Sequence, residues 1–142
     1  MNLRKFYQNL HSQKNNKIEG ETDLGLFKET PRYKFGMFVK IVGGGEEFKK
    51  QLCVFYDKDK TVKVDIVGEF LLYNRAWFWI DEFDKNNSEW VEAIGGYEYL
   101  EVLSALDLCI KFFEDLEEYE RCSHLITIKG LLKERAPPKN SI

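Results

Sequence analysis

The chain has 142 residues, 44% of them hydrophobic and 32% charged, with a formal net charge of −3. These values are typical of one globular domain and exclude wholesale disorder, and no apolar run reaches the roughly 18 residues needed to cross a bilayer. The N-terminus lacks the apolar stretch of a secretory signal, so we expect a cytoplasmic protein with no membrane partner. The domain should span residues 1–134, followed by a flexible tail at 135–142.

The first part of the chain predicts one short helix and then a strand. Apolar residues at helical spacing predict an amphipathic helix over residues 2–14, and the turn residues after it predict a loop over 15–32. From Tyr33 to Val42 apolar and other residues alternate, which predicts a strand with one buried face. Phe38 is the exception to that alternation.

A triple glycine at 43–45 separates this strand from the next apolar pattern. It favours a hairpin connection over a phosphate-binding loop, because Glu46 and Glu47 follow it and would repel phosphate. A second strand is expected at 48–56. A third is expected at 62–72, where apolar residues share one parity and charged residues take the other.

The aromatic stretch from Gly68 to Asp84 is the expected centre of the core, since large aromatic side chains bury the most apolar area. Its later part predicts a fourth strand, 76–81, reached through a tight turn at Asn74-Arg75. Residues 77–80 are apolar at every position. This pattern indicates a strand that is covered on both faces, or one that uses a face for binding.

Helices are expected after the sheet. Ser88 is the predicted N-cap of a short helix at Glu89–Ile94, and a continuous apolar stripe predicts a long helix over 97–120. Residues 123–129 fit either a fifth strand or one face of a second helix, and we favour the helix. The predicted fold class is α+β: an antiparallel β-meander of about four strands packed against a long C-terminal amphipathic helix, with a short N-terminal helix.

The charge is distributed unevenly along the chain. Residues 1–60 carry 12 basic and 8 acidic side chains, a net of +4, whereas residues 61–142 carry 9 and 16, a net of −7. Residues 81–120 alone have a net of −11, which favours cationic partners and repels nucleic-acid backbones. Against Lys85 and Lys111 this segment sets thirteen acids: Asp81, Glu82, Asp84, Glu89, Glu92, Glu98, Glu101, Asp107, Glu114, Asp115, Glu117, Glu118 and Glu120.

No motif for catalysis, metal binding or nucleotide binding stands out. His11 and His124 are too few for most metal sites. Asp84 opens a calcium-loop spacing, but Glu89 stands where that loop needs glycine and Gly95 where it needs the bidentate acid. We therefore expect a non-catalytic protein without cofactor or metal, although a nucleophile and base that meet only in the fold would leave no motif.

The charge pattern predicts a small cytosolic protein that binds and inhibits or neutralises a partner with a basic surface. Inhibitors of basic enzymes, nucleases especially, gain association rate and specificity from such a pattern. In size, acidity and aromatic content the chain resembles bacterial toxin-immunity proteins and phage-encoded inhibitors of host defence, a likeness of composition and not of motif.

The predicted partner-binding surface lies just beyond the fourth strand, where a rigid sheet would position its acids. Trp90 is the expected anchor, because an indole among acids suits the centre of an interface. The competing interpretation is that Trp90 folds back to cover the sheet. The surface consists of Asp81, Glu82, Asp84, Glu89, Trp90 and Glu92.

The alternative function is single-stranded nucleic-acid binding by the sheet. Aromatic platforms interleaved with lysines would stack bases in a positive groove, although the acidic half of the chain would repel the strand. The residues concerned are Phe38, Phe55, Tyr56, Lys34, Lys40, Lys49, Lys50, Lys58, Lys60 and Lys63.

The three cysteines, Cys53, Cys109 and Cys122, show no short paired spacing. This odd set favours reduced structural thiols over disulfides or a zinc site. We expect Cys53 and Cys109 to be buried, since both lie on or beside apolar faces of predicted elements.

Overall fold

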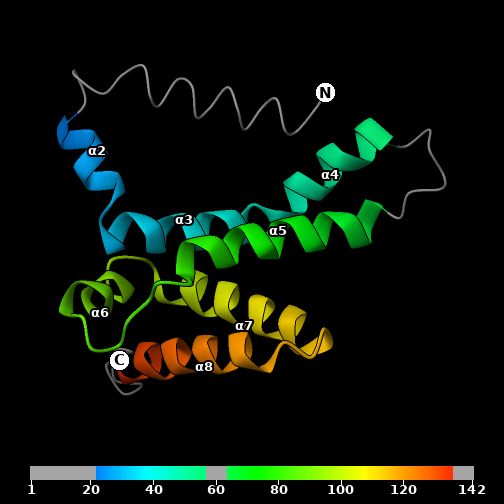
Figure 1. Ribbon diagram of the computed structural model, residues 1–142. Helices are drawn as coiled ribbons and strands as arrows, with labels where there is room; N and C mark the ends of the chain where they lie inside the picture. The colour runs from blue at the N-terminus through cyan, green and yellow to red at the C-terminus, as the bar shows by residue number, and fades with distance from the viewer. Residues whose placement is uncertain (1–21, 57–63, 136–142) are drawn as a thin grey trace, which may run out of the picture.

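The computed structural model describes residues 22–56 and 64–135, and the statements below concern those residues. Within them the chain forms seven helices and no strand (Figure 1). The helices are α2 (Thr22–Lys28), α3 (Pro31–Gly43), α4 (Gly45–Tyr56), α5 (Val64–Ile80), α6 (Ser88–Ile94), α7 (Tyr99–Asp115) and α8 (Tyr119–Glu134). The predicted helix at 2–14 and the predicted tail beyond Arg135 lie outside the described residues.

Helix α3 is the centre of the arrangement, since it packs against α5, α6 and α7. Figure 1 shows α3 and α5 side by side, with α7 and α8 forming an antiparallel hairpin beneath them. Helix α4 packs against α5, and α6 contacts both α3 and α8 at the other end of the bundle. The described chain is therefore a helical bundle built in layers around α3.

The predicted α+β fold is wrong, and the first expected strand shows why. Thr30 caps α3, its hydroxyl accepting from the backbone N–H of Tyr33, and Pro31 occupies the first turn. These are helix-start signals, and they outweigh the alternation that follows. The buried side chains of α3 are Phe35, Phe38, Val39 and Val42, a spacing of three and four residues. Phe38, the exception to the strand pattern, is thus a core residue of a helix.

The glycines at 43–45 join two helices and do not form a strand hairpin. Gly44 caps α3, and Gly45 begins α4 with its Cα against the Leu72 side chain of α5, where a Cβ would overlap Leu72 Cδ2. The second expected strand, 48–56, belongs to α4. A side chain at Gly45 would force Leu72 to move, so glycine suits the close approach of α4 to α5 at this point.

Helix α5 replaces both the third and the fourth expected strand. It runs through Asn74-Arg75, where a hairpin turn was predicted, without interruption. Residues 77–80 are apolar on both strand parities, and such a run is apolar all round a helix as well, so periodicity alone does not separate the two there. The aromatic stretch supplies Tyr73, Ala76, Ile80 and Phe83 to the core, but its aromatic residues Phe70 and Phe78 are exposed, contrary to expectation.

The helices predicted in the C-terminal half are confirmed. Helix α6 begins at Ser88, one residue earlier than predicted. Its N-cap is Asn87 and not Ser88, with Asn87 Oδ1 accepting from Glu89 N at 2.9 Å. Helix α7 covers most of the expected 97–120 segment, and the 123–129 segment lies within α8. Helix α7 carries a 3.6-residue apolar stripe, whereas the ambiguous 123–129 segment is helical because Leu125, Ile128 and Leu132 are buried on one side of α8.

Candidate functional site

The predicted acidic residues lie together around α6 and the connection that leads into it. Asp81, Glu82 and Asp84 follow the end of α5, and Glu89 and Glu92 lie on α6; all five are exposed. The connection is shaped by local hydrogen bonds, among them Asp84 Oδ1 accepting from Asn86 N at 2.9 Å. Glu82 forms an exposed ion pair with Lys34 of α3 at 2.7 Å, which links the connection to the central helix.

Trp90 lies in the core of the protein, in line with the competing interpretation of the sequence. Its side chain is 5% exposed, and its ring centroid is 5.4 Å from that of Phe83. The buried indole packs α6 against the rest of the protein, on the side of the helix away from the exposed acids. It fixes α6 against the body, so Glu89 and Glu92 project from a held helix.

All thirteen acids between residues 81 and 120 are exposed. Among the described residues, ion pairs engage two of them: Glu82 with Lys34, and Asp107 with Lys129 at 2.7 Å. The other carboxylates face solvent without a cation within ion-pair distance in the described part of the chain. Their field is consequently directed outwards and available to a second molecule.

A second group of acids, the acidic corner, lies where α7 passes into α8. The α7 helix ends in a Schellman motif, with Glu118 N donating to Phe113 O at 2.8 Å and Glu117 N donating to Glu114 O at 3.0 Å. Glu117 takes the left-handed conformation at φ 59°. Leu116 and Tyr119 are exposed beside it. The acidic corner consists of Glu114, Asp115, Glu117, Glu118 and Glu120.

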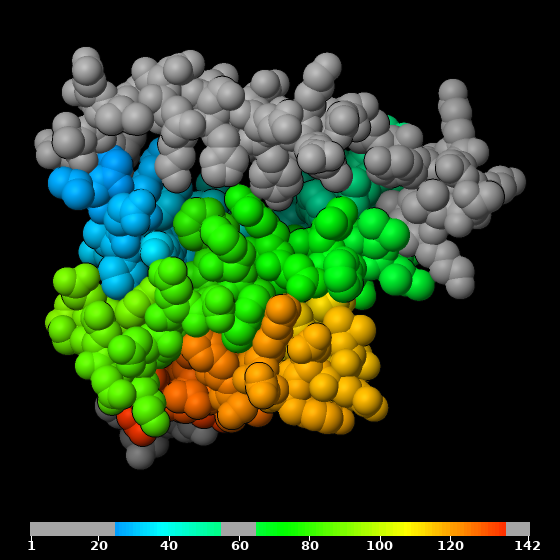
Figure 2. Space-filling model, in the orientation of Figure 1, coloured from blue at the N-terminus to red at the C-terminus, as the bar shows by residue number. Residues whose placement is uncertain are grey.

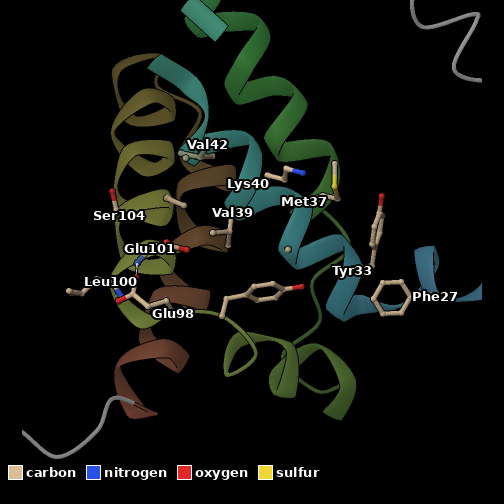
Figure 3. Close-up of a pocket in the computed structure, with 14 residues that line it drawn as sticks. Phe27, Tyr33, Met37, Val39, Lys40, Val42, Glu98, Leu100, Glu101 and Ser104 are labelled. Atoms are coloured by element: carbon tan, nitrogen blue, oxygen red, sulfur yellow. Dashed lines mark hydrogen bonds between the residues drawn. The ribbon is translucent and has the colours of Figure 1, made fainter. Parts of the chain in front are cut away.

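A groove of about 810 Å³ runs between α3 and α7 (Figure 3). Met37 and Lys40 border it on the α3 side, and Leu100 and Ser104 border it on the α7 side. Its walls combine apolar side chains with carboxylates and one lysine. This mixed lining does not indicate whether a ligand would be cationic or anionic. Sequence reasoning missed this groove because its two walls are separated by about sixty residues of chain.

The metal-ligating side chains of the described residues lie apart from one another. No cluster of three or more metal-ligating side chains occurs in that part of the chain. His124 is half-buried at the edge of the core, where its Nε2 lies 2.9 Å from Ile80 O and its ring packs edge-on to Trp77 and Phe83. Such contacts are those of a structural histidine.

The thiols divide into two kinds. Burial raises the pKa of Cys109 to about 12 and also raises the pKa of Cys122, so both are inert as nucleophiles near neutral pH. The prediction that Cys109 is buried is confirmed, but Cys53 is exposed on α4. The expected burial of Cys53 rested on a strand face that does not exist, since the turn of the helix carries Cys53 away from Leu52, which is buried.

The described part of the surface proposed for base stacking does not form a platform. Phe38 is 0% exposed, and Lys49 is paired with Glu69 of α5 at 3.0 Å. Lys58, Lys60 and Lys63 lie outside the described residues. With no sheet in the described chain, the surface on which the nucleic-acid alternative was based is absent there.

None of the described helices is both long and apolar enough to span a bilayer. Comparison of the chain with protein-family models, with curated proteins and with solved structures gave no match. The residues of the site are therefore interpreted from their own chemistry and placement alone.

Proposed function

We propose that the protein is a non-catalytic binding protein that engages, and inhibits or neutralises, a protein partner with a basic surface. One observation supports this most directly: every acid in the strongly acidic segment 81–120 is exposed, and most have no cation within reach in the described residues. Exposed acids contribute little to folding, whereas their summed field acts on charged molecules outside the protein.

The acids around α6 suit this role better than the acidic corner. Their backbone is held by the Lys34–Glu82 ion pair and by the Trp90–Phe83 contact, so their carboxylates are presented in a fixed arrangement. Fixed charges accelerate association with an oppositely charged partner and reject like-charged surfaces. An inhibitor gains from both effects, because it must find its target quickly among many proteins.

The test compares a charge-reversed variant with the unaltered chain. The change is Asp81→Lys, Glu89→Lys and Glu92→Lys, three exposed residues whose carboxylates make no hydrogen bond or ion pair within the described part of the chain. The tagged chain is used to capture a partner from the source cell, and association is then measured across salt concentrations. We expect roughly tenfold or greater loss of association rate and a flatter salt dependence.

A matched control carries Glu46→Lys, Glu47→Lys and Asp65→Lys, which changes the net charge equally on exposed positions of α4 and α5. This control should keep most of the association rate. If both variants bind the partner as the unaltered chain does, or if both lose binding equally, the acids around α6 are not the binding surface.

A further inference from the structure

Helix α5 exposes an apolar face that no described residue covers. Five of the thirteen exposed large apolar side chains in the described residues lie on this one helix. Figure 2 shows the side chains of α5, in green, across the middle of the molecular surface. The α5 face is defined by Ile66, Val67, Phe70, Leu71 and Phe78, which are 63%, 44%, 54%, 38% and 63% exposed.

The five side chains form a continuous patch. At 3.6 residues per turn they fall within an arc of about 140°, with Asn74 near its middle. The opposite side of α5 is buried through Leu72, Ala76 and Ile80, so the helix carries large apolar side chains on two opposite sides. A helix of that kind is normally surrounded by protein, which indicates that the α5 face is a contact surface.

The charge of the α5 face differs from that of the acidic surface. The face contains no acid, although the chain has 24 acidic residues. Glu69 of α5 points instead to α4, where it pairs with Lys49 at 3.0 Å. A face without carboxylates is not suited to the basic partner proposed above, and an apolar surface of matching shape is its natural complement.

We propose that the α5 face is the interface of a homodimer in which α5 packs antiparallel against α5 of a second copy. The five side chains expose on the order of 500 Å² before the rim is counted, which approaches the ~800 Å² per partner of a standard interface. A twofold interface also needs a surface that is complementary to itself.

The spacing along α5 meets that requirement. Val67, Leu71, Asn74 and Phe78 follow at intervals of four, three and four residues, the spacing of a helix–helix seam. In the antiparallel arrangement Val67 faces Phe78 of the second copy, and Leu71 faces Asn74 of the second copy. A parallel arrangement would instead bring the acids that follow α5 in both copies together, and like charges so placed repel.

The experiment measures the mass of the full-length chain in solution over a range of concentrations. The unaltered chain should have twice the monomer mass. Val67→Lys alone and Phe78→Glu alone should each shift it to the monomer, because each places two charges in the apolar seam. The double variant Val67→Lys with Phe78→Glu should return to the dimer, since each lysine then faces a glutamate of the other copy.

The matched control is Ile126→Glu, which alters an equally exposed apolar residue on α8 and should leave the dimer intact. Circular dichroism checks that each variant keeps its helices, and Val67→Ser and Phe78→Ser replace any charged variant that does not. An unaltered chain that stays monomeric overturns the proposal, whether the face is covered by residues 1–21 or by another protein. A dimer that survives both single changes overturns it as well.

Discussion

The hydroxyl of Tyr97 donates a hydrogen bond to the backbone carbonyl oxygen of Arg32 at 2.5 Å, across 65 residues of sequence. The same ring lies over Gly36 and tilts against Phe35, with centroids 6.0 Å apart. A Cβ at Gly36 would overlap the Tyr97 hydroxyl and ring edge. This missing side chain therefore lets the segment that precedes α7 seat against the first turns of α3.

Gly36→Ala is expected to lower the free energy of unfolding by about 1–3 kcal/mol, the usual cost of overpacking. Helix propensity favours alanine by only about 1 kcal/mol, and the Tyr97 ring is held by its hydrogen bond and by Phe35. Gly130→Ala is the control: a Cβ there meets nothing within 4 Å, so α8 should gain about 0.5–1 kcal/mol. Chemical denaturation checks both, and equal gains at both positions would contradict the close packing at Gly36.

Glu117→Gly is expected to stabilise the chain by about 0.5–1 kcal/mol. Relief of the left-handed conformation is worth about 1–2 kcal/mol, and the greater freedom of glycine in the unfolded chain removes about 0.4–1 kcal/mol of that gain. Glu120→Gly removes the same charge within α8 and should instead destabilise by up to about 1 kcal/mol. Thermal melting of both variants tests this prediction. A lower melting temperature for Glu117→Gly would show that the left-handed conformation of Glu117 is not a source of strain.

A thiol reagent should label the native protein fastest at Cys53, the exposed cysteine of α4. Cys109 and Cys122 are buried with raised pKa values, so they should react only when the protein opens or unfolds. Mass spectrometry of labelled peptides locates the reaction. Cys53→Ser should abolish the fast phase, and a fast phase that persists in this variant would show that one of the buried thiols is accessible.

Stability should fall at alkaline pH. Burial raises the pKa of Cys109 from 9.0 to about 12, so the unfolded chain releases this proton first. The stabilisation is complete below pH 9 and is lost as the pH rises from 9 towards 12. Burial of Tyr73 and the hydrogen bond of Lys49 to Glu69 raise the pKa of both groups, and their contributions act in the same direction.

This dependence is measured as melting temperature against pH. Cys109→Ala should give a shallower decline than the unaltered chain above pH 9, whereas Cys53→Ser should give a parallel one. Curves of equal slope for all three proteins would mean that ionisation of Cys109 is not linked to unfolding.

The sequence predicts secondary structure correctly where the apolar residues fit a helical period and no strand period. Helix α7 carries a stripe at 3.6-residue spacing that fits no strand, and its existence follows from that stripe. Its end at Asp115 was placed five residues too late, because a Schellman motif formed around Glu117 and not around a glycine gives no sequence signal.

The strands predicted in the first half of the chain are wrong for a physical reason. The Tyr33–Val42 segment satisfies a period of two and a period of 3.6 at once, and β-branched residues strengthen the first interpretation. The signals that decide are short: Thr30 as cap and Pro31 after it. In α5 the apolar residues at 77–80 indicate either coverage on both faces or one face used for binding. The described residues bury Ile80 but leave Phe78 exposed, so they do not cover all four positions.

The acidic site was predictable in part. Exposure of its carboxylates follows from composition, because unpaired charges are rarely buried. The burial of Trp90 does not follow from the sequence, because it depends on a contact between Phe83 and the α6 side chain in the folded chain. The α3–α7 groove and the extent of the α5 face depend likewise on packing between distant segments.

The central position of α3 has a consequence for how the chain acquires its structure. Helices α7 and α8 are adjacent in sequence and pack directly on one another, so their contacts form with little loss of chain entropy. The contacts of α3 with α5, α6 and α7 close much longer loops. During synthesis α3 leaves the ribosome before any of these three partners exists, with Phe35 and Phe38 still unburied. Helix α3 is therefore synthesised before its partners but is expected to pack against them late in folding. Between these two events its apolar side chains are exposed, and the chain is most open to aggregation or to binding by a chaperone.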